Sequence, residues 1–170
     1  MSYLNSTFGG VSADAFGIPG INRLALIEKS KITGYTGGDN VTAIAVTTGA
    51  KFQEIFFTED SANYTQELTS SASAKYITQT LNFRVESDEI AKAHSVILGR
   101  QYVALVKKSN GKWVVLGQTN GLRCTAATAN STEDDATLSF TLTAKNLGYG
   151  SNVTMTDTAL DALINVTATV

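Results

Sequence analysis

The stretch from Lys75 to Glu86 constrains the fold more than any other, because its side chains alternate along the chain. One face is apolar apart from a single amide and comprises Ile77, Gln79, Leu81, Phe83 and Val85. The other face comprises Tyr76, Thr78, Thr80, Asn82, Arg84 and Glu86. A period of two predicts a β-strand, and at about 3.3 Å per residue it would run about 40 Å, the diameter of a compact domain of this length. The strand is therefore expected to cross the whole domain, bend or project from it.

Shorter segments with the same period, or with unbroken apolar runs, predict the other strands. They span Asn22–Glu28, Val41–Thr47, Phe52–Thr58, Tyr64–Leu68, Tyr102–Lys107, Lys112–Gly117, Leu122–Thr125 and Thr137–Ala144. Asn110 and Gly111 join two of them, and Asn-Gly between apolar runs is the strongest short signal for a β-hairpin. Both strands of this hairpin are apolar on both faces. We therefore expect a central hairpin covered on two sides, with the second cover supplied by the helix expected over about 88–98 or by a neighbouring subunit.

Helical and irregular segments complete the expected fold. Ser87 is a good N-cap, and the period of 3.6 that follows it predicts one helix from about 88 to 98. A short C-terminal helix is expected over 157–164, with Thr156 as its cap. Glycine and proline over residues 1–20 predict an extended arm, and turn-forming or small polar residues predict a turn over 34–40 and a flexible loop over 126–136.

These elements together predict a mainly β protein. The expected architecture is an antiparallel β-sandwich or partly open barrel with one flanking α-helix over about 88–98. A short helix would lie near the C-terminus. The arm over residues 1–20 would precede a single β-rich domain over 21–170, since 170 residues suit one domain.

Composition excludes several classes of function. The chain has 13 basic and 15 acidic residues, and its charged fraction of 16% is low against about 25% in typical proteins. This balance argues against a nucleic-acid clamp, which needs a strongly basic face. One Cys and one His argue against a disulfide scaffold and a metal centre. No apolar run approaches the roughly 20 residues of a membrane span, and the first residues lack the features of a signal peptide.

Two candidate reactive side chains are isolated from the partners that catalysis needs. His94 is the only histidine, and the sequence indicates no nucleophile or orienting group for it. Cys124 follows Arg123, which could lower the pKa of a thiol. Without a second histidine to complete a Cys–His arrangement, Cys124 is better interpreted as a small core residue.

The acidic residues offer weaker candidates. Glu133, Asp134 and Asp135 are consecutive, but they lack the alternating spacing and fixed glycine of a calcium loop. Glu54, Glu59 and Asp60 leave open a hydrolase that uses a pair of carboxylates. We expect no enzyme: no catalytic residue, no cofactor-binding residue, no cofactor and no metal.

Two surface features have ordinary explanations. Lys107, Lys108 and Lys112 cluster near the expected hairpin tip, where they could keep the hairpin soluble, guard its edges or form a salt bridge between subunits. Six Asn-x-Thr triplets, beginning at Asn5, Asn40, Asn63, Asn130, Asn152 and Asn165, would be glycosylation acceptors in a secreted eukaryotic protein. In a Thr-rich β protein they arise by chance.

The order of elements carries a resemblance. A long strand leads into a single helix, and an Asn-Gly hairpin follows at once, among a Gly-rich arm, long polar loops and Thr-lined strand faces. This order resembles the tail-tube superfamily of bacteriophages and related injection systems, over about residues 22–144. The stretches 102–107 and 114–123 also look similar to small structural proteins of phages that infect Bacteroidetes-type bacteria.

The resemblance implies a noncatalytic virion component, part of a tail tube or of a neck or tail ring. Members of this family form stacked rings, so the implied partners are copies of the chain in a hexameric ring and other tail or neck proteins. DNA would pass as cargo without specific binding, and the protein would reach the virion after synthesis in the host cytoplasm. In such a ring the sheets of adjacent subunits join into a continuous inner barrel, which pairs their exposed edges.

Two polar strand faces suit that expectation. The Thr/Asn face of 75–86 and the Thr face of 137–143 would line a lumen without gripping phosphate, although both would serve equally well as solvent faces. An alternative function stays open: a surface or fibre binding module that recognises a glycan or a protein. Exposed Tyr or Trp clusters would favour this alternative, whereas Trp113 lies in the hairpin that is expected to be buried.

Overall fold

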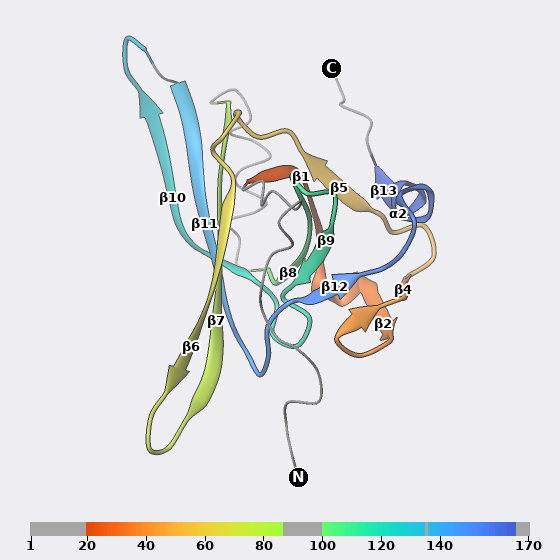
Figure 1. Cartoon of the computed structure of the whole chain (residues 1–170). Coiled ribbons are helices and arrows are strands. Elements are labelled where there is room, and N and C mark those ends of the chain that lie inside the picture. The colour runs from red at the N-terminus through yellow and green to blue at the C-terminus, as the bar shows by residue number, and fades with distance from the viewer. Residues whose placement is uncertain (1–19, 87–99, 135, 166–170) are drawn as a thin grey trace, which may run out of the picture.

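The computed structural model describes residues 20–86, 100–134 and 136–165 (Figure 1). The arm expected over residues 1–20, apart from Gly20, and the helix expected over 88–98 lie outside the described residues. Within them the chain is mainly β, with strands in three sheets, one 3-10 turn over Lys29–Lys31 and one α-helix, α2 (Asp157–Leu163). The expected fold class, an antiparallel sandwich with a short helix, is confirmed.

A seven-stranded sheet, here called the central sheet, has the order β13-β5-β1-β8-β9-β12-β3. Its strands are β1 (Ile21–Glu28), β3 (Asn40–Val41), β5 (Phe52–Ile55), β8 (Tyr102–Lys108), β9 (Trp113–Leu116), β12 (Ser151–Val153) and β13 (Ile164–Asn165). The predicted hairpin is confirmed, since β8 and β9 pair antiparallel at the middle of this sheet. Parallel pairing occurs only near the two ends of the sheet, between β12 and β3 and between β13 and β5.

A four-stranded antiparallel sheet, here called the long sheet, has the order β10-β11-β7-β6. Its strands are β6 (Asn63–Ser70), β7 (Lys75–Glu86), β10 (Arg123–Ser131) and β11 (Ala136–Asn146). Strand β7 has the predicted bounds. Figure 1 shows the β10–β11 and β6–β7 hairpins extending past the central sheet in opposite directions. The strand of about 40 Å that was expected to cross the domain, bend or project from it therefore projects at the end where it forms a hairpin with β6.

The central sheet is buried on both faces. One face packs against the long sheet, and this core includes Leu24 and Val114 from the central sheet and Leu81, Phe83 and Phe140 from the long sheet. The opposite face is covered by α2 and by a two-stranded sheet of β2 (Ile32–Thr36) and β4 (Ala43–Val46). The two-sided cover expected for the central hairpin is confirmed, and its second layer is built from these elements of the same chain.

Several expected boundaries were wrong. The loop expected over 126–136 is mostly strand, because β10 continues to Ser131 and pairs residue by residue with β11. The strand expected over Val41–Thr47 is divided between β3 and β4, and the one over Phe52–Thr58 ends at Ile55. The turn expected over 34–40 begins later, since β2 extends to Thr36. Small polar residues in these segments do not reveal by themselves that a neighbouring strand supplies their hydrogen bonds.

Candidate functional site

The outer face of the long sheet is an array of hydroxyl and amide side chains. Cross-strand rows include Asn63–Asn82–Thr141 and Thr65–Thr80–Thr143. The side-chain amide of Asn82 donates to Oδ1 of Asn63 over 3.0 Å, and the hydroxyl of Thr141 donates to Oδ1 of Asn82 over 2.8 Å. We call this surface the polar face.

The polar face largely follows the sequence pattern. Strand β7 contributes its even-numbered residues, which are half-buried or exposed. From β11 the sequence pattern placed four residues outside, but Thr137 is buried, with only 6% of its surface exposed. Charges on the polar face are few and of both signs: Glu67, Arg84, Glu86, Arg123 and Lys145.

The two edges of the long sheet are open in the described part of the chain. No described strand pairs with the outer side of β6 or of β10. Strand β10 is exposed along its length except at Cys124 and carries one charge, on Arg123. Strand β6 also carries one charge, on Glu67. Natural proteins protect long edge strands with lysine, proline, bulges or covering segments, so two long and nearly neutral edges form a surface suited to strand pairing.

A buried amide network links the long sheet to the central sheet. Gln79, the polar residue that interrupts the apolar run of β7 from Ile77 to Val85, is 2% exposed. Its Oε1 accepts from the backbone N–H of Gly117 and from the side-chain amide of Asn146, each over 2.9 Å. Its own amide donates to Oε1 of Gln66 over 3.1 Å, and that oxygen also accepts from the N–H of Gly150.

This network fixes the place where the projecting β6–β7 hairpin leaves the core. Asn146 in turn accepts from the backbone N–H of Asn120 over 2.8 Å, so three strands of the long sheet are tied to two turns that connect this sheet with the central sheet. Gly117 has φ 79° and a Cβ there would lie 2.8 Å from the carbonyl oxygen of Tyr102, so the position requires glycine. Every polar atom of the Gln79 side chain that the core encloses thereby has a partner, as burial demands.

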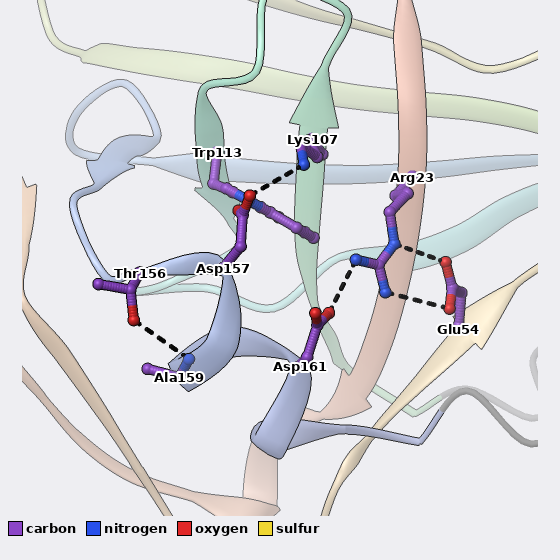
Figure 2. Close-up of polar contacts among 8 residues, drawn as sticks. All are labelled: Arg23, Glu54, Lys107, Trp113, Thr156, Asp157, Ala159 and Asp161. Carbon is purple, nitrogen blue, oxygen red and sulfur yellow. Dashed lines mark hydrogen bonds and ion pairs between the residues drawn. The ribbon is translucent and has the colours of Figure 1, made fainter.

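A second polar cluster docks α2 on the central sheet (Figure 2). Thr156 caps the helix, since its hydroxyl accepts from the N–H of Ala159 over 3.2 Å, as predicted. Arg23 of β1 forms two bonds to Glu54, of 2.8 and 3.3 Å, and a third to Asp161 of α2 over 2.8 Å. These carboxylates, the hydrogen bond to Glu54 above all, raise the pKa of Arg23 above its usual range.

Trp113 is the other anchor of α2. Its indole N–H donates to Oδ1 of Asp157 over 2.9 Å, while Lys107 donates to Oδ2 of the same carboxylate over 3.3 Å. The Arg23 guanidinium lies 5.4 Å and the Lys107 ammonium 5.6 Å from the indole centroid, within the range of cation–π attraction. Lys107 is thus engaged within its own chain, which corrects the expectation of a solvated or intersubunit lysine at a hairpin tip.

The Asp157 carboxylate should titrate below its ordinary pKa of 3.8, because the hydrogen bond from Trp113 and then the bond from Lys107 favour its charged form. A pKa depressed in the folded state stabilises the fold above the unfolded value, and this contribution is lost as the pH falls through the folded value. An NMR titration of the Asp157 carboxyl is expected to give a midpoint below 3.8. A midpoint at or above 3.8 would contradict the docking geometry. Asp157→Asn, which keeps an acceptor for Trp113, should remove this part of the acid sensitivity.

The structure does not bring the candidate reactive residues together. Burial raises the pKa of the Cys124 thiol, the opposite of nucleophile activation. Glu54 is held by Arg23, whereas Glu59 and Asp60 lie exposed in a turn. His94 and Asp135 lie outside the described residues.

Within the described ranges no three His, Cys, Asp or Glu side chains gather as a metal site would require. The same residues include no helix long and apolar enough to cross a membrane. A surface depression lined by Glu28, Lys29, Ser30, Arg100 and Gln101 is bridged by the Arg100–Glu28 ion pair.

Sequence reasoning missed two features of this site. The open edge on β10 was hidden in the expected loop. The amide network had one signal, since Gln79 was the single polar residue in the apolar run from Ile77 to Val85 on one strand face. Comparison of the chain with protein-family models, with characterised proteins and with solved structures finds no match.

Proposed function

We propose that the protein is a noncatalytic structural component of a virion, which assembles with copies of itself into a ring of a tail tube or neck. The observation that carries this proposal is the long sheet, whose two different edges, β6 on one side and β10 on the other, are left open by the described strands. When one edge of each copy pairs with the opposite edge of the next, the interface is heterologous, and such interfaces generate a ring when the rotation between copies closes. Six copies is the number that the resemblance to tail-tube proteins suggests.

The chemistry of the polar face supports a conduit for DNA. Most of its side chains are Thr, Ser and Asn, and its five charged residues, three basic and two acidic, are distributed over its rows rather than gathered in one patch. Hydroxyl and amide groups without a basic cluster hold phosphate weakly, since affinity for nucleic acid comes mainly from Lys and Arg. DNA would therefore pass without being bound, and the remaining partners would be other tail or neck proteins of the virion.

The alternative of a glycan- or protein-binding module gains no support from the aromatic residues. Trp113 is 3% exposed and lies beneath two cations. Tyr149 is the only tyrosine in the described part of the chain that is largely exposed. An aromatic platform for sugar rings would need several such side chains on one surface.

The solution size of the purified protein tests this proposal. Sedimentation velocity over a rising concentration series is expected to show monomers giving way to a discrete species of several copies. High salt should change this distribution little, because the pairing surface is nearly neutral and surface charge is what salt screens. A protein that stays strictly monomeric at high micromolar concentration would contradict the proposal.

A further inference from the structure

We infer that β10 of one copy pairs antiparallel with β6 of the next, with Ala127 opposite Gln66, and that the polar face lines the inside of the resulting barrel. This inference rests on the proposed ring and goes beyond it, because it specifies the partner strands, their register and the lumenal face. It follows from three properties of the long sheet: the direction of its free backbone groups, the stagger of its edges and the handedness of β-sheets.

The first property is that the free backbone groups of both edges belong to residues on the core side. The carbonyl of Arg84 accepts from the N–H of Thr58, on the β6 side of β7. The carbonyl of Thr141 accepts from the hydroxyl of Thr125, on the β10 side of β11. Since alternate residues of an antiparallel strand bond to opposite neighbours, the polar-face residues of β6 and β10 bond inside the sheet. Their core-side residues, such as Gln66 and Ala127, direct N–H and C=O outward.

The second property is that the two edges are staggered along the strands. Ala127 lies opposite Phe140, which lies opposite Phe83, whereas Gln66 lies opposite Gln79. Bringing Ala127 of one copy level with Gln66 of the next thus requires a shift of four residues along β7, about 14 Å at 3.4 Å per residue. The four strands of one copy span about 19 Å at about 4.8 Å per strand.

This stagger fits a closed barrel. A shift of one residue for each strand corresponds to a strand tilt of about 36°, as in eight-stranded barrels of shear eight. Slipping the pairing by two residues would give a tilt of about 20° or about 47°, outside the usual 35–45°. A slip of one residue would place polar-face side chains on the core side. Only the pairing of Gln66 with Ala127 therefore closes flat rings with an ordinary tilt.

The third property, handedness, selects the lumenal face. For L-residues on a strand that runs upward with side chains toward the viewer, N–H and C=O point to the right. Seen from the polar face with β7 upward, β6 is therefore on the right, and β10 is on the left and displaced upward. Because strands have a right-handed twist, the strands of a closed barrel rise from left to right when the barrel is seen from outside. In a flat ring of such a barrel, seen from outside, the right-hand edge of each copy must lie higher along the strands than its left-hand edge. The higher edge is β10, and it is on the right only when the sheet is seen from its core side. The polar face must therefore be inside.

The side chains in this register are complementary. On the polar face, Thr65 meets Thr128 and Asn63 meets Asn130, pairs that form hydrogen bonds across strands. On the other face the large side chains of β6 meet small residues of β10, with Tyr64 opposite Ala129 and Gln66 opposite Ala127. Leu68, which is 54% exposed in the single copy, lies beside this small-residue stretch and becomes covered. No like charges lie opposite each other.

Disulfide trapping tests the register. In a Cys124→Ser background, Thr65→Cys with Thr128→Cys places two thiols in a non-hydrogen-bonded pair, where Cα atoms are about 4.5 Å apart and a disulfide can form. Within one copy these positions are about 20 Å apart across the sheet, so any bond must join two copies. Oxidation of the concentrated protein is expected to give a ladder on a non-reducing gel. Matched controls, Thr65→Cys with Ala126→Cys or with Asn130→Cys, move the second thiol by about 7 Å and should give at least about tenfold less product.

The outcomes separate this inference from the proposed function. If the protein assembles but a control pair is trapped most strongly, the proposed register is wrong. If it assembles and no pair is trapped, the pairing of β10 with β6 is wrong. Neither result contradicts the ring itself. Absence of assembly in every variant overturns both proposals. The lumenal face is tested with Thr80→Cys and Ala162→Cys and a maleimide that carries a long polymer. Assembly should protect the thiol at position 80 from the maleimide and leave the thiol at position 162 reactive. If assembly protects both thiols equally, or leaves the thiol at position 80 reactive, the polar face does not line the lumen.

Discussion

Gln79→Leu is expected to lower the free energy of unfolding by about 3 kcal/mol, although leucine is more apolar and of similar size. The substitution leaves the N–H of Gly117 and the amide of Asn146 without their acceptor, in a place that is closed to water. Each buried unsatisfied group costs about 1–3 kcal/mol, and the gain from burying a methyl group is smaller than this loss. Urea denaturation followed by circular dichroism measures the change.

Gln53→Leu is the matched control, since Gln53 lies on β5 with its side chain exposed. Its replacement should change the unfolding free energy by less than about 0.5 kcal/mol, as is usual for surface sites. A loss below about 1 kcal/mol for Gln79→Leu would mean that the amide network does not hold the base of the β6–β7 hairpin. The network would then not explain why a polar residue interrupts the apolar face of β7.

Ala127→Pro is expected to abolish assembly while the single copy stays folded. In the proposed register, the N–H of Ala127 points away from β11 and is the donor that would bond to the neighbouring β6. Proline removes this donor and places its ring on the pairing edge, so the neighbouring strand can no longer pair there. The single copy tolerates proline at this position because the outward N–H of an edge strand is not needed for pairing within the sheet. Sedimentation velocity should show only monomer, with a far-ultraviolet circular dichroism spectrum like that of the parent protein.

Ala127→Val retains the N–H and favours a strand, so it should assemble like the parent chain. Together the two variants distinguish a lost edge donor from a change of side chain. Full assembly of a folded Ala127→Pro variant would mean that β10 is not the pairing edge.

Sequence reasoning succeeded where a side-chain pattern reflects the environment directly. The alternation in β7 reports one buried and one polar face, and it fixed both ends of that strand correctly. The unbroken apolar run around Trp113 reports two covered faces, which the two cores confirm. Thr156 and Asp157 indicated the start of α2 in the sequence because capping is a local interaction.

The failures occurred where long-range pairing decides the structure. In β10, Ala, Thr and Asn residues alternate weakly because the strand projects past the core and buries little on either face. Its order comes from the ladder with β11, which no local pattern encodes. For the candidate site, the polar face could be predicted from alternation, whereas the amide network and the stagger of the edges require the register of four strands.

Electron microscopy of the purified, concentrated protein tests the central claim most directly. Class averages are expected to show closed rings or stacked tubes with an open centre. Four strands of about 4.8 Å spacing tilted by about 36° add about 24 Å of circumference for each copy, so six copies would give a backbone diameter of about 45 Å. Single copies only, or open fibrils without a central channel, would contradict the account.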